Sequence, residues 1–173
     1  MFRYNVLFFC LIIGVFFTGC EKDSPASIEE DKQEFTGRST WKIIQQDILD
    51  QSCTSCHMVG TSFAEQSDLI LTADVAYSQL IDRVPHNQAA IDDGLKLVGT
   101  EGLPSLYKSY LWEKINAPDK DHFYADHPFY GSIMPMGLDF LTNGQLEFIR
   151  QWIVAGAPNA GVVADSTILQ DTV

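Results

Sequence analysis

The chain has 173 residues, with 11 Lys and Arg against 23 Asp and Glu, 46% hydrophobic residues and four Cys. This length suits one domain with tails, and the apolar and aromatic content excludes a disordered chain. A net charge of −12 argues against binding to nucleic acid, whose phosphates attract basic patches. The same charge argues against electrostatic docking on an anionic membrane surface.

The N-terminal residues have the pattern of a targeting segment. Residues 6–17 are almost continuously apolar and follow Arg3, which is the only charged residue among the first 20. A bilayer span needs about 20 apolar residues, so this shorter run fits the core of a secretory signal peptide. We therefore expect residues 1–19 to be a signal peptide that directs the chain out of the cytoplasm.

The segment ends in Thr18, Gly19 and Cys20, which resemble the lipobox of bacterial lipoproteins. The match departs at Phe17, where that family usually carries Leu. The resemblance implies that Cys20 is lipidated and anchors the chain to a bacterial membrane, on the periplasmic or cell-surface side. The alternative is a signal peptide cleaved elsewhere. We expect residues 20–38 to comprise the lipidated Cys20 and a flexible acidic tether.

A first helix is predicted over residues 41–52. Its apolar residues recur at positions i, i+3 and i+7 and so share one face: Trp41, Ile44 and Ile48. Ser39 or Thr40 precedes the run as an N-cap.

This helix leads into Cys53-Thr54-Ser55-Cys56-His57, the C-x-x-C-H pattern of c-type haem attachment. Two residues between the Cys match the spacing of the haem vinyl groups, each of which takes one thioether. The His then lies beneath the iron. We predict one covalent haem c held by Cys53 and Cys56, with His57 as the proximal axial ligand.

Other interpretations of the two Cys are weaker. A thioredoxin-like dithiol needs a βαβ context, which the surrounding sequence lacks. A disulfide would close a small, strained loop. A structural zinc site would need two further ligands close by, and the other paired candidates, His122 and His127, are far along the chain. A disulfide and a zinc site remain the alternatives.

Two shorter helices are predicted in the middle of the chain. One covers residues 73–82, with Thr72 as its cap, and the other covers residues 105–116, opened by Pro104 or Ser105. Residues 118–131 have the composition of an inserted loop.

Met134 is the predicted distal ligand of the iron. It lies in a stretch where Pro135 stiffens the chain and Gly137 permits a turn, so that its thioether is carried on a stiff loop. Met136 is the alternative. The remaining histidines, His86, His122 and His127, are expected in loops or at the surface, with bis-His ligation less favoured.

A last helix is predicted over residues 143–155, with a capping box from Thr142 to Gln145 and an end at Gly156. Its apolar stripe and that of the first helix can bury each other. Because no alternating strand pattern of useful length appears, the predicted class is all-α.

Residues 40–158 resemble a class I cytochrome c domain, in particular a bacterial form with an M-P-x-G motif followed by W-I-x-x-G-A. Here these are Met134-Pro135-Met136-Gly137 and Trp152-Ile153-Val154-Ala155-Gly156-Ala157. The resemblance implies a cytochrome c fold, over residues 39–158, with four to five helices around one haem, and with the axial Met on Met134. Residues 159–173 are then a polar tail. The stretch from His57 to Met134 is long for compact members of the class.

The function implied is extracytoplasmic electron transfer by a His57/Met134-ligated haem on a lipid tether, and not an enzymatic reaction. The acidic surface favours redox partner proteins with a basic docking patch. One alternative is a haem-based ligand sensor or peroxidase-like enzyme, in which Met134 dissociates. Another is a haem subunit of a larger extracytoplasmic redox complex, contacted through residues 118–131.

Overall fold

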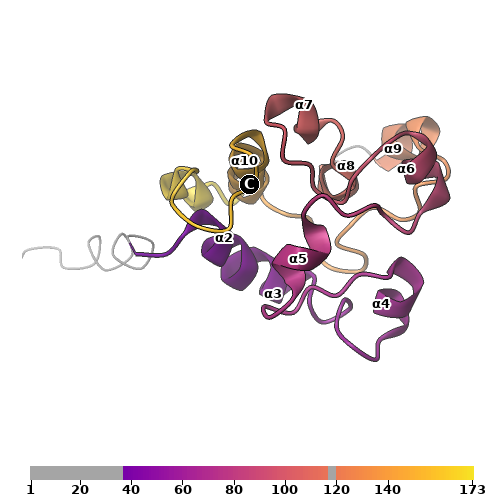
Figure 1. The fold of residues 1–173 in the computed structure, drawn as a ribbon, viewed down its shortest axis with the longest axis horizontal. Coiled ribbons are helices and arrows are strands. Elements are labelled where there is room, and N and C mark those ends of the chain that lie inside the picture. The colour runs from indigo at the N-terminus through magenta and orange to yellow at the C-terminus, as the bar shows by residue number, and fades with distance from the viewer. Residues whose placement is uncertain (1–36, 117–119) are drawn as a thin grey trace, which may run out of the picture.

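The computed structural model describes residues 37–116 and 120–173, and in these residues the chain consists of short helices joined by turns (Figure 1). The same residues contain no β-strand; their extended pairings are two isolated parallel bridges, Ile81 with Val98 and Lys96 with Ser109. The predicted all-α class is confirmed. The helical content is divided more finely than the four to five helices that the resemblance implies.

The first predicted helix is present. It consists of α2 (Thr40–Ile43), a π-helical segment η1 (Ile44–Leu49) and α3 (Asp50–Ser52), which follow one another without a break. Ser39 is its N-cap, because its hydroxyl accepts a hydrogen bond from the Lys42 amide at 3.2 Å. The helix buries the predicted apolar face and ends directly before the two Cys.

The last predicted helix is α10 (Asn143–Val154), which begins with the predicted capping box between Thr142 and Gln145. Its buried face carries Phe148, Ile149, Trp152 and Ile153. The Trp152 ring stacks on that of Trp41 with their centres 5.2 Å apart, so that the first and last helices share one core. Burial of these large apolar side chains is the main stabilisation of the domain.

The predicted helix over residues 73–82 is shorter in the structure, where α5 covers Ala76–Leu80. It ends early because the chain turns into a bridge with a distant segment: Val98 donates to the Leu80 carbonyl and accepts from the Asp82 amide, at 3.0 and 2.8 Å. Pairing with a distant segment therefore overrides the local helical pattern.

The predicted helix over residues 105–116 is two helices, α7 (Leu103–Leu106) and α8 (Tyr110–Ile115). Backbone hydrogen bonds to Lys96 break the helix, because its amide donates to Lys108 and its carbonyl accepts from Tyr110, at 3.0 and 2.7 Å. The Ser109 hydroxyl donates to the Ser105 carbonyl at 2.6 Å and so satisfies a carbonyl at the end of α7.

Three α-helices lie outside the predicted elements: α4 (Ser62–Ser67), α6 (Gln88–Asp92) and α9 (Lys120–Asp126). The expectation that residues 118–131 are a loop is wrong, because they include α9. Helices α6 and α9 lie at the same end of the molecule (Figure 1). Ala90 of α6 and Phe123 of α9 belong to a second, smaller core, together with Leu95, Tyr130 and Ile133.

The C-terminal residues 159–173 pack against the domain and contain a short 3-10 helix, η2 (Ser166–Gln170). The Thr40 hydroxyl accepts hydrogen bonds from the Val163 and Ala164 amides at 2.9 and 3.2 Å. Near α10, the Asp171 carbonyl accepts from the Gly144 amide at 3.2 Å. This segment, to which the sequence assigned no role, therefore connects the first turn of α2 with that of α10.

Candidate functional site

A cavity of about 590 Å³ lies between the segment that follows α3, helix α8 and the loop after Tyr130. Its volume is within the ~300–1,000 Å³ of typical pockets for small molecules and cofactors. All five residues that the sequence predicted for the haem line this cavity: Cys53, Cys56, His57, Met134 and Met136. The predicted lipidation site, Cys20, lies outside the described residues.

Helical hydrogen bonds continue from the first helix into the two Cys. The Cys53 amide donates to the Leu49 carbonyl at 2.9 Å, and the amides of Cys56 and His57 both donate to the Cys53 carbonyl at 3.1 Å. Both Cys are free thiols, so the structure contains no disulfide between them. Burial, together with the neighbouring Cys56, raises the pKa of the Cys53 thiol to about 12.

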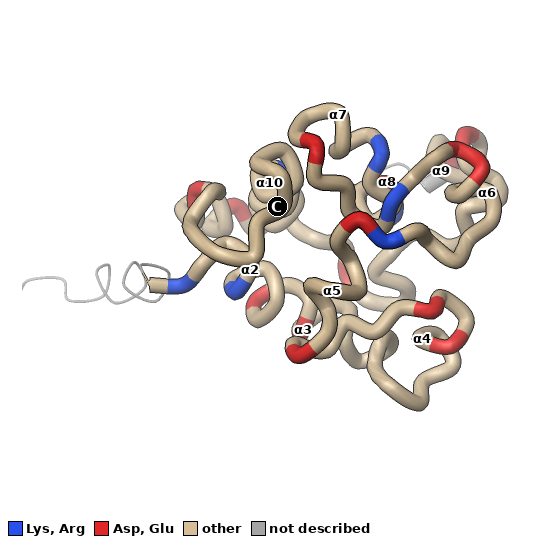
Figure 2. The backbone as a smooth tube through the Cα atoms, viewed as in Figure 1, with Lys and Arg blue, Asp and Glu red and all other residues tan. Residues whose placement is uncertain are grey.

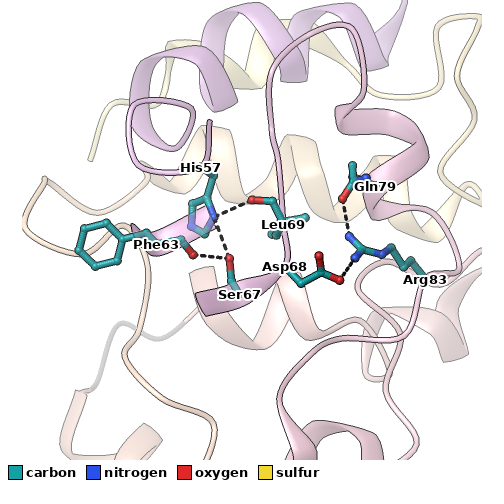
Figure 3. Close-up of polar contacts among 7 residues, drawn as sticks. All are labelled: His57, Phe63, Ser67, Asp68, Leu69, Gln79 and Arg83. Atoms are coloured by element: carbon teal, nitrogen blue, oxygen red, sulfur yellow. Dashed lines mark hydrogen bonds and ion pairs between the residues drawn. The ribbon is translucent and has the colours of Figure 1, made fainter. Parts of the chain in front are cut away.

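The imidazole of His57 is held through one ring nitrogen (Figure 3). Its Nδ1 lies 3.3 Å from the Leu69 carbonyl oxygen and 3.3 Å from the Ser67 hydroxyl. A carbonyl only accepts, and the Ser67 hydroxyl donates its own proton to the Phe63 carbonyl at 2.7 Å. Nδ1 is therefore the protonated nitrogen, and Nε2 keeps a free lone pair for a metal ion.

Burial also lowers the pKa of His57, although the hydrogen bond to Leu69 acts in the opposite direction. Asp68, the residue before Leu69, forms an ion pair with Arg83 (Figure 3). Arg83 also donates a hydrogen bond to the side chain of Gln79, which fixes this turn. Burial thus favours the neutral ring, and the hydrogen bond to Leu69 orients it, as a histidine metal ligand requires.

The two methionines differ in their surroundings. Met134 is partly buried and packs against the main core, whereas 44% of Met136 is exposed. Pro135 between them is buried, and Gly137 turns the chain with φ +77°. Met134 is also attached to α8, because its amide donates to the Lys114 carbonyl at 2.8 Å.

Lys114 is a cavity residue that the sequence analysis missed. Only 8% of it is exposed, and its ammonium group donates to the Tyr130 carbonyl at 2.8 Å. Burial lowers the pKa of Lys114 to about 8. Lys114 follows Tyr110 and Leu111 by four and three residues, and both of these also line the cavity. This helical spacing could have predicted that Lys114 shares their face of α8.

The remaining histidines lie outside any metal cluster, since no three His, Cys, Asp or Glu side chains of residues 37–116 and 120–173 gather to hold an ion. His122 pairs with Asp126 at 2.9 Å on α9. His127 stacks on Tyr130 with ring centres 4.4 Å apart. His86 is exposed, as expected, and also lines the cavity.

The charged side chains of the described residues are mainly acidic, and Figure 2 shows Asp and Glu on most of the helices. Among these residues, no helix has both the length and the apolar character needed to cross a bilayer.

Compared with protein-family models, with curated proteins and with solved structures, the chain gives no match. What this chain does is therefore inferred from its own residues and their geometry.

Proposed function

We propose that the chain is a single-haem c-type cytochrome with a class I cytochrome c fold, which transfers electrons outside the cytoplasm. The observation that carries this proposal is the meeting of Cys53, Cys56, His57 and Met134 at one cavity. The first three are neighbours in sequence, but Met134 comes from a distant loop.

The residues present fit a covalent haem. Cys53 and Cys56 are free thiols at the wall of the cavity, and each can add its S–H across a vinyl double bond without an oxidant. His57 offers Nε2 to the iron, with the Leu69 carbonyl keeping its other nitrogen protonated. Met134 supplies a thioether, a soft ligand that raises the reduction potential relative to a second imidazole.

Bound haem supplies an iron that exchanges single electrons between its ferrous and ferric states. If His57 and Met134 both held the iron, no coordination position would be left for a substrate. Apolar side chains such as Leu71, Leu80 and Leu97 line the cavity and would pack against the haem ring. This arrangement favours an electron carrier over an enzyme.

The N-terminal pattern supports a location for the proposed carrier. We propose that lipidated Cys20 and the residues up to 38 tether the domain to a bacterial membrane, on its periplasmic or cell-surface side. The acidic surface then speeds encounter with redox partners that present a basic patch, and salt weakens this steering.

The test is to produce the full chain in a host that matures c-type cytochromes and to record visible spectra and a redox titration. We expect a reversible one-electron couple and a low-spin, six-coordinate spectrum in both oxidation states. A five-coordinate, high-spin ferrous form would contradict the carrier function. Absence of haem would contradict the whole proposal.

A further inference from the structure

The cavity is lined by residues from several elements. Cys53 and Cys56 line it from the segment that follows α3, whereas Tyr110, Lys114 and Tyr130 line it from α8 and the loop beyond α9. Figure 1 shows α8 towards the end of the molecule that carries α6 and α9, apart from α3. These three residues bring polar groups to the cavity, beside the apolar Leu111 and Ile115 of α8.

Hydrogen bonds hold these polar groups to one segment of the chain. The Tyr130 carbonyl accepts from both the Tyr110 hydroxyl and the Lys114 ammonium, at 2.5 and 2.8 Å. Asn87, another lining residue, donates to the Phe129 carbonyl at 2.8 Å. The side chains of Tyr110 and Lys114 therefore meet at one carbonyl, and Asn87 bonds the carbonyl before it.

Lys114 is a buried cation without a counter-ion among residues 37–116 and 120–173, because no carboxylate there lies within 4.0 Å of its nitrogen. The adjacent Glu113 points to His127 instead, at 3.7 Å. Among the described residues, the ammonium bonds one carbonyl and lies near two aromatic rings, Tyr110 and Phe123, whose centres are 5.5 and 5.8 Å away.

A carbonyl and ring faces compensate a buried charge only in part, and burying an ion without full compensation is costly. The ammonium has three donors, and one of them bonds the Tyr130 carbonyl. Gly131, a lining residue, is next to it: a Cβ added there would lie 3.7 Å from the nitrogen. The cavity is thus where an anion can reach the free donors.

We propose that Lys114 is a haem-positioning residue whose ammonium pairs with a propionate carboxylate of the bound haem. This inference rests on the proposed function. Haem carries its vinyl groups on one edge and its propionates on the opposite edge. Attachment of the vinyl edge to Cys53 and Cys56 therefore directs the propionates away from them, and Lys114 lines the cavity from a different element, α8.

The same residue would link the propionate to the distal loop. The Lys114 carbonyl accepts from the Met134 amide. The Lys114 ammonium donates to the Tyr130 carbonyl, which precedes this loop. Pairing with the carboxylate fixes α8 relative to the haem, and α8 in turn fixes Met134.

The first test replaces Lys114 with Met, which keeps the length of the side chain and removes its charge. Loss of a buried charge is not expected to unfold the protein. We expect Lys114→Met to retain covalent haem and to have a lower midpoint potential, because an uncompensated propionate stabilises ferric iron. The potential should also fall as pH rises through the neutral range, because the propionate then titrates at a higher pKa.

Lys96→Met is the matched control, since Lys96 is exposed and does not line the cavity. It should keep the wild-type potential and pH profile. If Lys114→Met behaves like this control, the ion pair is absent and the inference fails although haem is bound. Absence of haem from the wild type would instead refute the proposed function.

A second measurement needs no variant. In the reduced, diamagnetic wild-type protein, nuclear Overhauser contacts should join the side-chain methylene protons of Lys114 to the methylene protons of one propionate. If both sets of resonances are assigned and no contact is found, the inference is overturned.

Discussion

The amide of Met134 donates a hydrogen bond of 2.8 Å to the carbonyl of Lys114, which attaches the loop of the predicted distal ligand to helix α8. Main-chain hydrogen bonds of this kind position a loop without depending on which side chains it carries. The thioether of Met134 is thus held at the cavity, while the nearby Met136 is left largely exposed.

Replacement of Met134 by Ala should remove the Met-to-iron(III) charge-transfer band of the oxidised holoprotein and lower its midpoint potential, because the iron loses its soft ligand. Met136→Ala should change neither. Both are read from absorption spectra and redox titrations. If the band is lost in Met136→Ala and kept in Met134→Ala, the assignment of the two thioethers is reversed.

Trp152→Ala should destabilise the domain strongly. The indole is fully buried, stacks on Trp41 and donates to the Pro158 carbonyl at 3.0 Å. Emptying a site of this size costs about 3–5 kcal/mol. Chemical denaturation of the holoprotein measures this loss. Tyr107→Ala, at a side chain that is 66% exposed, serves as the control and should change the unfolding free energy little; equal losses would contradict the core described above.

Gly144→Ala tests whether the C-terminal segment is bound to α10. A Cβ at this position would lie 2.2 Å from the Ile168 carbonyl oxygen and 2.7 Å from that of Asp171. The segment must move away, and we expect a loss of about 1–3 kcal/mol together with faster proteolysis of residues 159–173. A Cβ at Gly37 meets nothing within 4 Å, so Gly37→Ala should behave as wild type. Unchanged protection in Gly144→Ala would show that the segment does not pack there.

Glu113 gives a pH dependence whose sign follows from burial. Desolvation raises the pKa of Glu113 above its usual value of 4.5, although the neighbouring His127 lowers it in part. The folded chain therefore binds this proton more tightly than the unfolded chain. The free energy of unfolding then falls as pH rises above the usual pKa of a Glu side chain, 4.5. The unfolding free energy of wild type relative to Glu113→Gln should fall over this range. A difference that is constant or rises with pH would contradict this prediction.

Those features that depend on neighbouring residues could be predicted from the sequence. The C-x-x-C-H motif, the Ser39 cap and the capping box at Thr142 are local patterns, and the two helices that begin at these caps form as predicted. Met134 was predicted from its own loop, and the structure brings it to the same cavity as His57.

The features that were missed depend on contacts between distant segments. The break before α8 follows from pairing with Lys96, which no helical pattern encodes. The Leu69 carbonyl at His57 is a main-chain group and leaves no trace in residue types. Lys114 was passed over because a lysine on a short amphipathic helix is normally exposed.

The central claim is that haem is bound covalently through Cys53 and Cys56, and the mass of the denatured full-length protein tests it most directly. We predict the mass of the mature chain plus one haem, located by peptide mapping to the segment from Cys53 to His57. The Cys53→Ala, Cys56→Ala double variant should lose this added mass. A denatured wild-type chain without bound haem, after production in a host that matures c-type cytochromes, would contradict the account.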